Sequence, residues 1–202
     1  MSMSNFDSRA REWDNNPDRA RRAEAVAAAI RRQVPLRSDM EALEYGCGTG
    51  LLSFALRPYL GAITLADNSA GMLEVVQEKI SAAGAQNMFP VRLDLSIEPP
   101  LPRTYSLIYT MLAMHHISDL APVLRGFQAM LAPGGFLCIA DLDKEDGTFH
   151  EGSFAGYNGF ERAEFRQWLL EAGFGNVRFE TCYAIPKHNR LYPMFLAIAE
   201  KP

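Results

Sequence analysis

The sequence is poor in the features that mark secreted, metal-binding and membrane proteins. Among its 202 residues it has three cysteines, Cys47, Cys138 and Cys182, an odd number at scattered spacings that matches neither a disulfide framework nor a zinc site. We therefore expect three small buried side chains and no metal. No apolar run approaches the roughly 20 residues that span a bilayer, and the first residues lack the apolar core of a signal peptide. These absences predict a cytoplasmic protein without a membrane span.

Positive charge is also scarce. The chain has 20 basic and 24 acidic residues, a formal net charge of −4, and no long basic run. Binding to the phosphates of a nucleic acid thus has no general electrostatic support, and no nucleic-acid partner is expected. A hydrophobic content of 48% can fill a sizeable core, and the length fits one soluble domain over residues 1–202.

Glycine, in contrast, is concentrated where it carries information. The stretch 42–50 reads Ala-Leu-Glu-Tyr-Gly-Cys-Gly-Thr-Gly, with Gly46, Gly48 and Gly50 between a short apolar run and a helical pattern. Glycine has no Cβ, so the backbone can turn sharply with positive φ and lie directly against a ligand. The pattern predicts a ligand-binding turn after a first strand.

A carboxylate follows at the end of the next apolar run. Residues 62–67 predict a second strand that ends at Asp67, whose two oxygens can accept both hydrogens of a ribose diol. A nicotinamide dinucleotide is one candidate, but its turn requires G-x-G-x-x-G, and here Leu51 stands in the place of the third glycine. Glu44, just before the turn, suits a cofactor with an ammonium and a sulfonium better than one with phosphates.

With these motifs, the chain resembles the class I S-adenosylmethionine-dependent methyltransferases of the small-molecule type from about residue 41 to 202. Five segments follow the order of that family: 43–50, 67–74, 91–95, 105–117 and 131–141. The resemblance implies an enzyme that uses S-adenosyl-L-methionine, releases S-adenosyl-L-homocysteine and methylates a small-molecule acceptor.

The resemblance also implies a cofactor site. Glu44 would face the methionine amino group, Asp67 the ribose hydroxyls and Asp94 the adenine N6 amine, with Leu95 and Met72 beside the ring. As alternatives, these acids are ordinary N-cap, loop or turn residues. The complete predicted cofactor-binding set is Glu44, Gly46, Cys47, Gly48, Gly50, Asp67, Asn68, Met72, Asp94, Leu95, Met111 and Trp13.

Short apolar runs alternate with amphipathic segments, which predicts an α/β fold with helices on both faces of the sheet. Strands are expected at about 41–45, 62–67, 88–92, 105–110 and 134–141, and helices from Asn16-Pro17 onward and at about 50–59, 69–83, 119–131 and 160–172. The runs 177–183 and 194–199, joined by a turn-rich segment, must pair antiparallel. The resemblance then implies a Rossmann-like seven-stranded sheet of order 3-2-1-4-5-7-6 with strand 7 antiparallel.

Residues 1–37 form a predicted helical extension before the core at 41–202. Phe6 and Trp13 could close over the cofactor as a lid, and a frayed terminus is the alternative. The arginines of the first long helix fall on its non-apolar face, which predicts a solvated face more than a nucleic-acid patch. They are Arg19, Arg21, Arg22, Arg31 and Arg32.

Candidate bases follow the fourth and fifth strands. His115 and His116 lie where acceptors approach in this family, and His150 lies in a long glycine-rich loop at about 141–159. We predict His116 and His150 as catalytic; alternatively, a histidine at 115 or 116 caps a helix or fills the loop, and the long loop is a mobile surface segment.

Two other functions remain open at this point. One is a non-catalytic regulator that binds S-adenosylmethionine, because the cofactor half is better marked than the acceptor half. The other is a nicotinamide-dependent oxidoreductase, which the glycine spacing and the closing hairpin disfavour.

Overall fold

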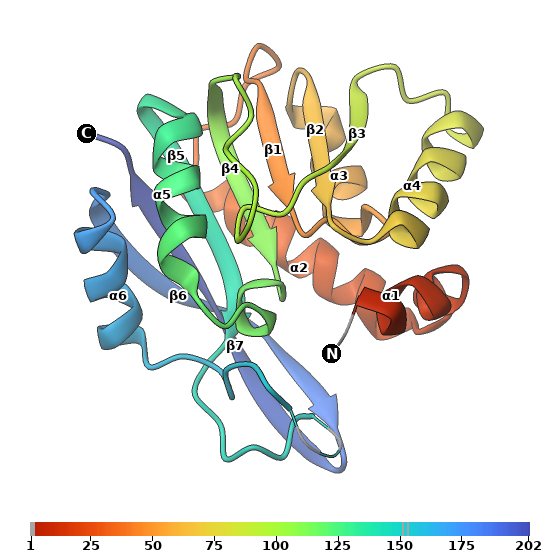
Figure 1. Cartoon of the computed structure of the whole chain (residues 1–202), viewed down its shortest axis with the longest axis vertical. Coiled ribbons are helices and arrows are strands. Elements are labelled where there is room, and N and C mark those ends of the chain that lie inside the picture. The colour runs from red at the N-terminus through yellow and green to blue at the C-terminus, as the bar shows by residue number, and fades with distance from the viewer. Residues whose placement is uncertain (1–2, 151, 153) are drawn as a thin grey trace.

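Seven strands form one sheet in the order β3-β2-β1-β4-β5-β7-β6 (Figure 1). The computed structural model describes residues 3–150, 152 and 154–202. β7 runs antiparallel to both of its neighbours, and the other paired strands are parallel. The predicted order and antiparallel strand are confirmed. The strands are β1 (Ala42–Tyr45), β2 (Ile63–Asp67), β3 (Met88–Arg92), β4 (Tyr105–Met111), β5 (Leu131–Leu142), β6 (Gly175–Lys187) and β7 (Arg190–Glu200).

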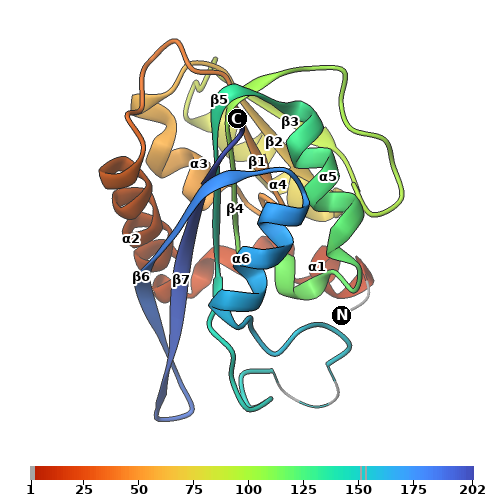
Figure 2. The ribbon, with the colours of Figure 1, turned by 90° about the vertical axis from the view of Figure 1, so that its left-hand side faces the viewer.

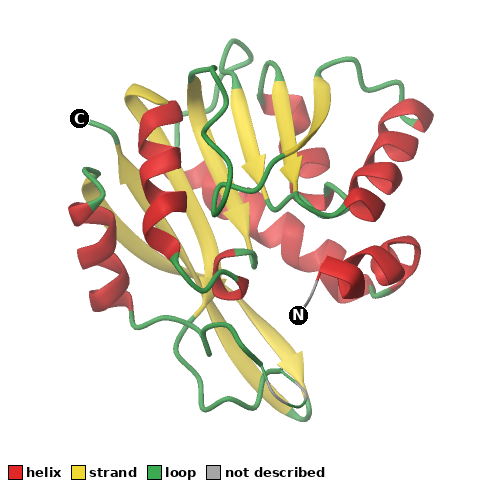
Figure 3. Cartoon of the chain, viewed as in Figure 1, coloured by secondary structure: helices red, strands yellow, loops and turns green. Residues whose placement is uncertain are grey.

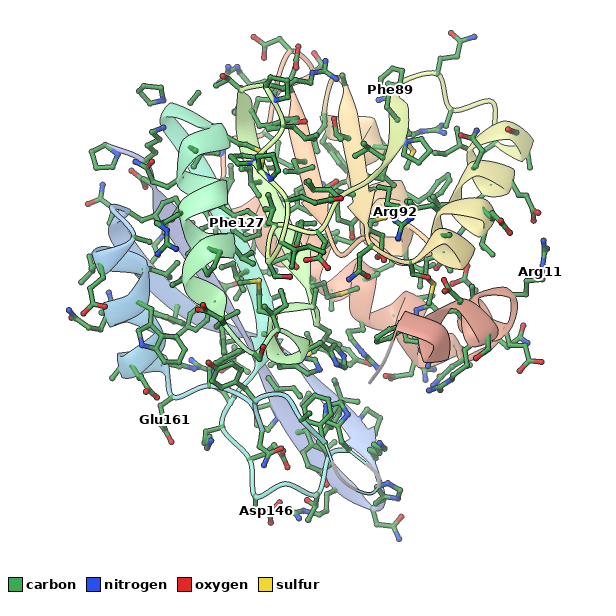
Figure 4. The ribbon with its side chains drawn as sticks, viewed as in Figure 1. Arg11, Phe89, Arg92, Phe127, Asp146 and Glu161 are labelled. Carbon is green, nitrogen blue, oxygen red and sulfur yellow. The ribbon has the colours of Figure 1, made fainter. Side chains whose placement is uncertain are left out.

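Helices cover both faces of the sheet and bury two separate apolar clusters (Figures 2 and 3). On one face lie α2 (Pro17–Gln33), α3 (Leu51–Leu56) and α4 (Ala70–Ala82). The other face is covered by α5 (Leu120–Met130) and α6 (Arg162–Glu171). Phe127 of α5, labelled in Figure 4, is completely buried against that second face. The sheet is thus held from both sides, as expected for mostly parallel strands.

Local capping fixes where the helices begin. The side chain of Asn16 accepts a hydrogen bond from the backbone N–H of Asp18 at the start of α2, so the predicted start at Asn16-Pro17 is confirmed. Ser69 caps α4 in the same way, and Asp119 caps α5. These side chains satisfy backbone donors that the first helical turn leaves unpaired.

The expectation of a turn-rich segment between the last two strands is wrong. β6 and β7 continue through it and join at a two-residue turn, where His188 and Asn189 both have positive φ, 50° and 59°. Such a turn matches the twist of paired strands. Pro186 is tolerated there because β6 is an edge strand. The long hairpin extends below the carboxyl ends of the parallel strands (Figure 1).

Within the predicted helical extension 1–37, the chain forms α1 (Met3–Arg9) and the 3₁₀ helix η1 (Ala10–Asn15) ahead of α2. Two further 3₁₀ turns are η2 (Arg57–Tyr59) and η3 (Met114–His116). Within the described part of the chain, no helix combines the length and apolarity needed to cross a membrane. All three cysteines are free; Cys47 and Cys138 are buried and Cys182 is partly exposed.

Candidate active site

A cavity of about 690 Å³ lies at the carboxyl ends of the central strands. The ends of β1, β2 and β4 contribute to its wall, together with residues of α1, η1, α2 and the β6–β7 hairpin. Its volume falls within the range of about 300–1,000 Å³ that is typical of small-molecule sites. Strand order reverses between β1 and β4, and ligands of open α/β sheets bind at such a point.

The glycine turn after β1 forms one wall of this cavity. Gly46 and Gly48 both have positive φ, 67° and 53°. A Cβ on Gly46 would lie 2.5 Å from Cβ of Ala113 in the loop after β4, which leaves no room for a side chain. At Gly48, the nearest atoms to such a Cβ would be Sδ of Met72 and Nε1 of Trp13, 3.9 and 4.0 Å away. Gly48 therefore presents bare backbone between two side chains that line the cavity.

Asp67 occupies the end of β2 with its carboxylate directed to this turn. One oxygen accepts from the Gly48 N–H at 2.7 Å and the other from the Ser69 N–H at 2.9 Å. Burial raises the pKa of Asp67, and these backbone hydrogen bonds oppose the rise. Each carboxylate oxygen can accept a second hydrogen bond, so a diol facing the cavity is compatible with this arrangement.

Asn68 and Asp94 extend the polar wall after β2 and β3. Asn68 Nδ2 donates to Asp94 Oδ2 at 3.0 Å, while Asp94 Oδ1 accepts from the backbone N–H of Ser96. Burial acts to raise the pKa of Asp94, but the hydrogen bonds from Asn68 and Ser96 outweigh it and lower the pKa. Asp94 therefore both closes a turn and lines the cavity, so the two interpretations of this residue are compatible.

Glu44 is almost completely buried, with 2% of its surface exposed, yet it also lines the cavity. Its carboxyl group accepts hydrogen bonds from the backbone N–H and the hydroxyl of Ser53, and that hydroxyl in turn contacts Tyr109 Oη at 2.7 Å. Burial raises the pKa of Glu44 from 4.5 to about 8, with the charge of Asp67 adding to the effect. A cation at this wall would favour the ionised carboxylate.

Two members of the predicted cofactor set lie in packed positions outside the cavity wall. Gly50 does not line the cavity; its φ is 78°, and a Cβ there would lie 2.7 Å from Cγ2 of Val76. Leu95 lies against Gly126 of α5 in the second apolar cluster, and its N–H donates to Tyr45 Oη at 3.1 Å. The remaining predicted cofactor residues all line the cavity: Glu44, Gly46, Cys47, Gly48, Asp67, Asn68, Met72, Asp94, Met111 and Trp13.

The N-terminal segment reaches the cavity through Phe6 and Trp13. Two aspartates attach the segment to the core. Asp7 accepts hydrogen bonds from Ser69 and Gly71 at the start of α4, and Asp14 accepts one from Thr49 Oγ1 at 2.6 Å. Asp14 also pairs with Lys79 at 2.6 Å. These contacts anchor the segment beside the glycine turn, where a role as a lid stays a prediction.

A histidine and an aspartate meet near the paired ends of β4 and β5. His115 Nδ1 lies 2.6 Å from Asp141 Oδ1, and both side chains are buried. Asp141 also accepts from the backbone N–H groups of Leu142 and His115. A neutral imidazole that donates from Nδ1 to this carboxylate oxygen would carry its acceptor lone pair on Nε2. The sequence interpretation did not include Asp141 in the site, although Asp141 lies in β5 directly after Ala140, which pairs with Met111 at the end of β4.

His116 and His150, the two predicted catalytic residues, also line the cavity but differ from His115. Burial, reinforced by the neighbouring histidines, lowers the pKa of His116 to about 2 and that of His150 to about 4. Nδ1 of His116 and Nε2 of His150 have no hydrogen-bond partner among the described residues. The ring of His150 stacks on Phe154 with centroids 3.6 Å apart. Their catalytic role stays a prediction.

Four basic side chains complete the wall: Arg9 of α1, Arg19 and Arg22 of α2, and Lys187 of β6. The expectation that the arginines of this helix form a solvated face is wrong for Arg19 and Arg22, which are half-buried. Arg19 stacks on Trp13, with its guanidinium carbon 3.7 Å from the ring centroid, and Arg22 pairs with Asp18 at 2.9 Å. Among residues 3–150, 152 and 154–202, no group of three or more metal-ligating side chains is arranged to hold an ion.

Known proteins identify the family. The family model described as a methyltransferase domain matches residues 19–186. An uncharacterized methyltransferase of Schizosaccharomyces pombe is 35% identical over 121 residues, which cover 56% of this chain and 43% of that protein. A malonyl-[acyl-carrier protein] O-methyltransferase of Magnetococcus marinus is 34% identical over 122 residues, 58% of this chain and 43% of that protein. The matches span less than half the length of both relatives.

The fold is shared with solved structures of low sequence identity. An S-adenosylmethionine-dependent methyltransferase from Clostridium acetobutylicum aligns with a TM-score of 0.72 at 15% identity, covering 97% of this chain and 98% of that one. The family model, the sheet order and the glycine turn with its carboxylates all agree. This chain therefore belongs to the class I S-adenosylmethionine-dependent methyltransferases.

Proposed function

We propose that this protein transfers a methyl group from S-adenosylmethionine to a small-molecule acceptor that must lose a proton from its reacting atom. The observation that carries the proposal is the His115–Asp141 pair, placed in the same cavity as the carboxylates of the glycine turn. A relative named as an O-methyltransferase supports an oxygen acceptor.

The residues on the cofactor side fit the proposed cofactor. Its donor groups are a ribose diol, an adenine amine and an ammonium, and the wall presents three carboxylates to accept from them: Asp67, Asp94 and Glu44. Gly48 leaves this wall open, since a side chain there would project between Met72 and Trp13. We propose that Asp67 holds the ribose, Asp94 the adenine and Glu44 the amino group.

When bound, S-adenosylmethionine supplies a methyl group on a positively charged sulfur, which leaves as a neutral thioether. The protein then has to align the acceptor, exclude water and remove a proton. Alignment and exclusion of water account for roughly 7–11 kcal/mol in well-oriented reactions. The rings of Phe6, Phe149 and Phe154, packed around the histidines, supply the apolar enclosure.

His115 is the best-placed base for the proton. Its Nε2 carries the lone pair, and Asp141 both orients the ring and stabilises the cation that forms when the ring takes a proton. His116 lacks such a partner at Nδ1 among the described residues, and its low pKa makes it a weak base. We therefore assign the base to His115, with His116 and His150 shaping the cavity around it.

The test compares matched histidine variants on a panel of phenols, carboxylic acids and amines, with release of S-adenosylhomocysteine as the readout. His115→Gln should lower kcat by about 10²–10⁴-fold and leave the affinity for S-adenosylhomocysteine unchanged. Asp141→Asn should act in the same direction and displace the pH profile of kcat/KM. His116→Gln is the matched control and should retain most of the rate.

Two results would contradict this proposal. If His116→Gln abolishes turnover while His115→Gln retains it, the base is His116. If the protein binds S-adenosylmethionine but the whole panel gives no turnover, a non-catalytic cofactor-binding regulator becomes the better interpretation.

A further inference from the structure

Basic side chains gather at the part of the cavity formed by α2 and the β6–β7 hairpin. Arg19 and Arg22 come from α2, and Lys187 comes from β6. The hydroxyl of Tyr183 donates to Asp18 at 2.7 Å and so fixes the first turn of α2 beside β6. Asp67, the last residue of β2, and Asp94, shortly after β3, instead lie near the opposite edge of the sheet. The cavity thus has an acidic side and a basic side.

The positive charge on the basic side is only partly compensated. Arg22 pairs with Asp18, but its buried Nε has no hydrogen-bond partner among the described residues. Arg19 donates to the backbone carbonyl of Trp13, and Lys187 to that of Phe149. Within the described chain, no carboxylate forms an ion pair with Arg19 or Lys187. The carbonyl groups accept hydrogen bonds from Arg19 and Lys187 but do not neutralise the positive charges of these side chains.

Mutual repulsion among these cations is visible at Arg19. Burial lowers the pKa of Arg19, and the charges of Arg9 and Arg22 lower it further, while the charge of Asp14 opposes this effect only in part. Likewise, Lys187 is one of the charges that lower the pKa of His150, after burial and His115. Partly buried cations without a counter-charge are unfavourable, and an anion in the cavity would relieve this cost.

We infer that the acceptor carries a carboxylate or phosphate group, and that Arg19, Arg22 and Lys187 bind it beside the histidines. This inference rests on the proposed function and specifies the class of its substrate. Lys187 donates to the carbonyl of Phe149, the residue directly before His150. An anion held by Lys187 would therefore place the rest of the acceptor close to the His115–Asp141 pair.

The anion that these cations bind could also belong to the cofactor, because the methionine part of the cofactor has its own carboxylate. The first arm of the experiment separates these sources by calorimetry. S-adenosylhomocysteine and 5′-methylthioadenosine, which lacks the amino-acid part, are titrated into the wild type, Lys187→Gln and Arg22→Gln. Arg21→Gln is the matched control, since Arg21 lies on the same helix, is 67% exposed and does not line the cavity.

The second arm uses 4-hydroxybenzoate, 4-hydroxyphenyl phosphate and the neutral 4-hydroxybenzamide with protein saturated by S-adenosylhomocysteine. At least one anion should bind, and at least tenfold more tightly than the amide. Lys187→Gln and Arg22→Gln should each weaken its binding about tenfold. Both variants should keep the wild-type affinity for S-adenosylhomocysteine, and Arg21→Gln should match the wild type throughout.

This binding arm does not depend on turnover, so its result is distinct from failure of the proposed reaction. Equal binding of the amide and the anions, or no binding of either anion, would overturn the inference. It would also be overturned if the variants weaken the binding of S-adenosylhomocysteine but not that of 5′-methylthioadenosine, because the cations would then bind the carboxylate of the cofactor.

Discussion

Glu44 provides a sharp test of the electrostatics of the site, because its carboxyl group is buried and its pKa is raised from 4.5 to about 8. The folded protein therefore binds this proton more tightly than the unfolded chain. The contribution to stability is complete below pH 4.5 and is lost as the pH rises toward 8. Within that interval the free energy of unfolding falls by about 1.4 kcal/mol for each pH unit.

Between pH 6.0 and 7.5 the expected loss from Glu44 is thus about 2 kcal/mol. For a domain of this length, that corresponds to a decrease in Tm of roughly 4–8 °C. Glu44→Gln keeps the shape of the side chain but cannot ionise, so it removes this pH dependence. The experiment is thermal unfolding of both proteins, without ligand, at several pH values in this range.

All other titrating groups, including the histidines, are common to the two proteins, so the difference between their Tm curves isolates Glu44. Glu78→Gln is the control because Glu78 is an exposed glutamate, and its curve should run parallel to that of the wild type. Parallel curves for Glu44→Gln and the wild type would refute the reasoning, since they would mean that Glu44 is already ionised in the folded protein at neutral pH.

The ionisation of Glu44 should also make cofactor binding depend on pH. If Glu44 faces the ammonium group as proposed, binding requires the ionised carboxylate, and affinity for S-adenosylhomocysteine should rise up to tenfold per pH unit below pH 8. The affinity for 5′-methylthioadenosine, which has no ammonium, should change much less. Equal pH slopes for the two ligands would place Glu44 outside the ammonium site.

Three further predictions follow from single contacts. Asp67→Asn should weaken the binding of S-adenosylhomocysteine by about 2 kcal/mol, measured by calorimetry, because it removes a charged acceptor that Gly48 and Ser69 hold in place. Unchanged affinity would contradict the assignment of Asp67 to the ribose. Gly46→Ala should lower Tm much more than Gly84→Ala, since both have positive φ but only Gly46 has a neighbour 2.5 Å from the added Cβ. Asp14→Asn should expose the N-terminal segment to limited proteolysis, whereas Asp39→Asn, at an exposed ion pair, should not.

Much of the fold could be predicted because apolar periodicity and glycine position act locally. The parallel strands and the helices that follow them lie within a few residues of their expected positions, and their caps at Asn16, Ser69 and Asp119 are visible in the sequence. The hairpin was harder, because Pro186 and Pro193 normally indicate turns. Pro186 is tolerated because β6 is an edge strand, and Pro193 lies in β7 beyond Met194, where the pairing with β5 ends, so tertiary position decided what the local pattern could not.

A helical extension over residues 1–37 was predicted, but apolar periodicity could not give the bounds of α1 and η1 within it. They are attached by polar contacts over long sequence separation, such as Asp7 with Ser69 and Asp14 with Lys79. Two neighbouring histidines posed a similar problem. Sequence spacing placed both after β4, but the direction of each ring depends on the backbone at Leu112, which has a φ of 55°, and on the 3₁₀ turn that follows. Such positive φ is unusual for leucine, and the sequence contains no signal for it.

The position of the strand-order reversal explains why the three carboxylates and His115, which pairs with Asp141, line the same cavity. Glu44 and Asp67 lie at the ends of β1 and β2 and Asp94 follows β3, while His115 follows β4 and Asp141 lies at the end of β5. These two halves of the sheet join where β1 pairs with β4, and there the glycine turn contacts the histidine loop at Gly46 and Ala113. A side chain at position 46 would separate the loops. The absence of a Cβ at Gly46 therefore keeps the two halves close enough for the cofactor proposed on one to lie next to the acceptor proposed on the other.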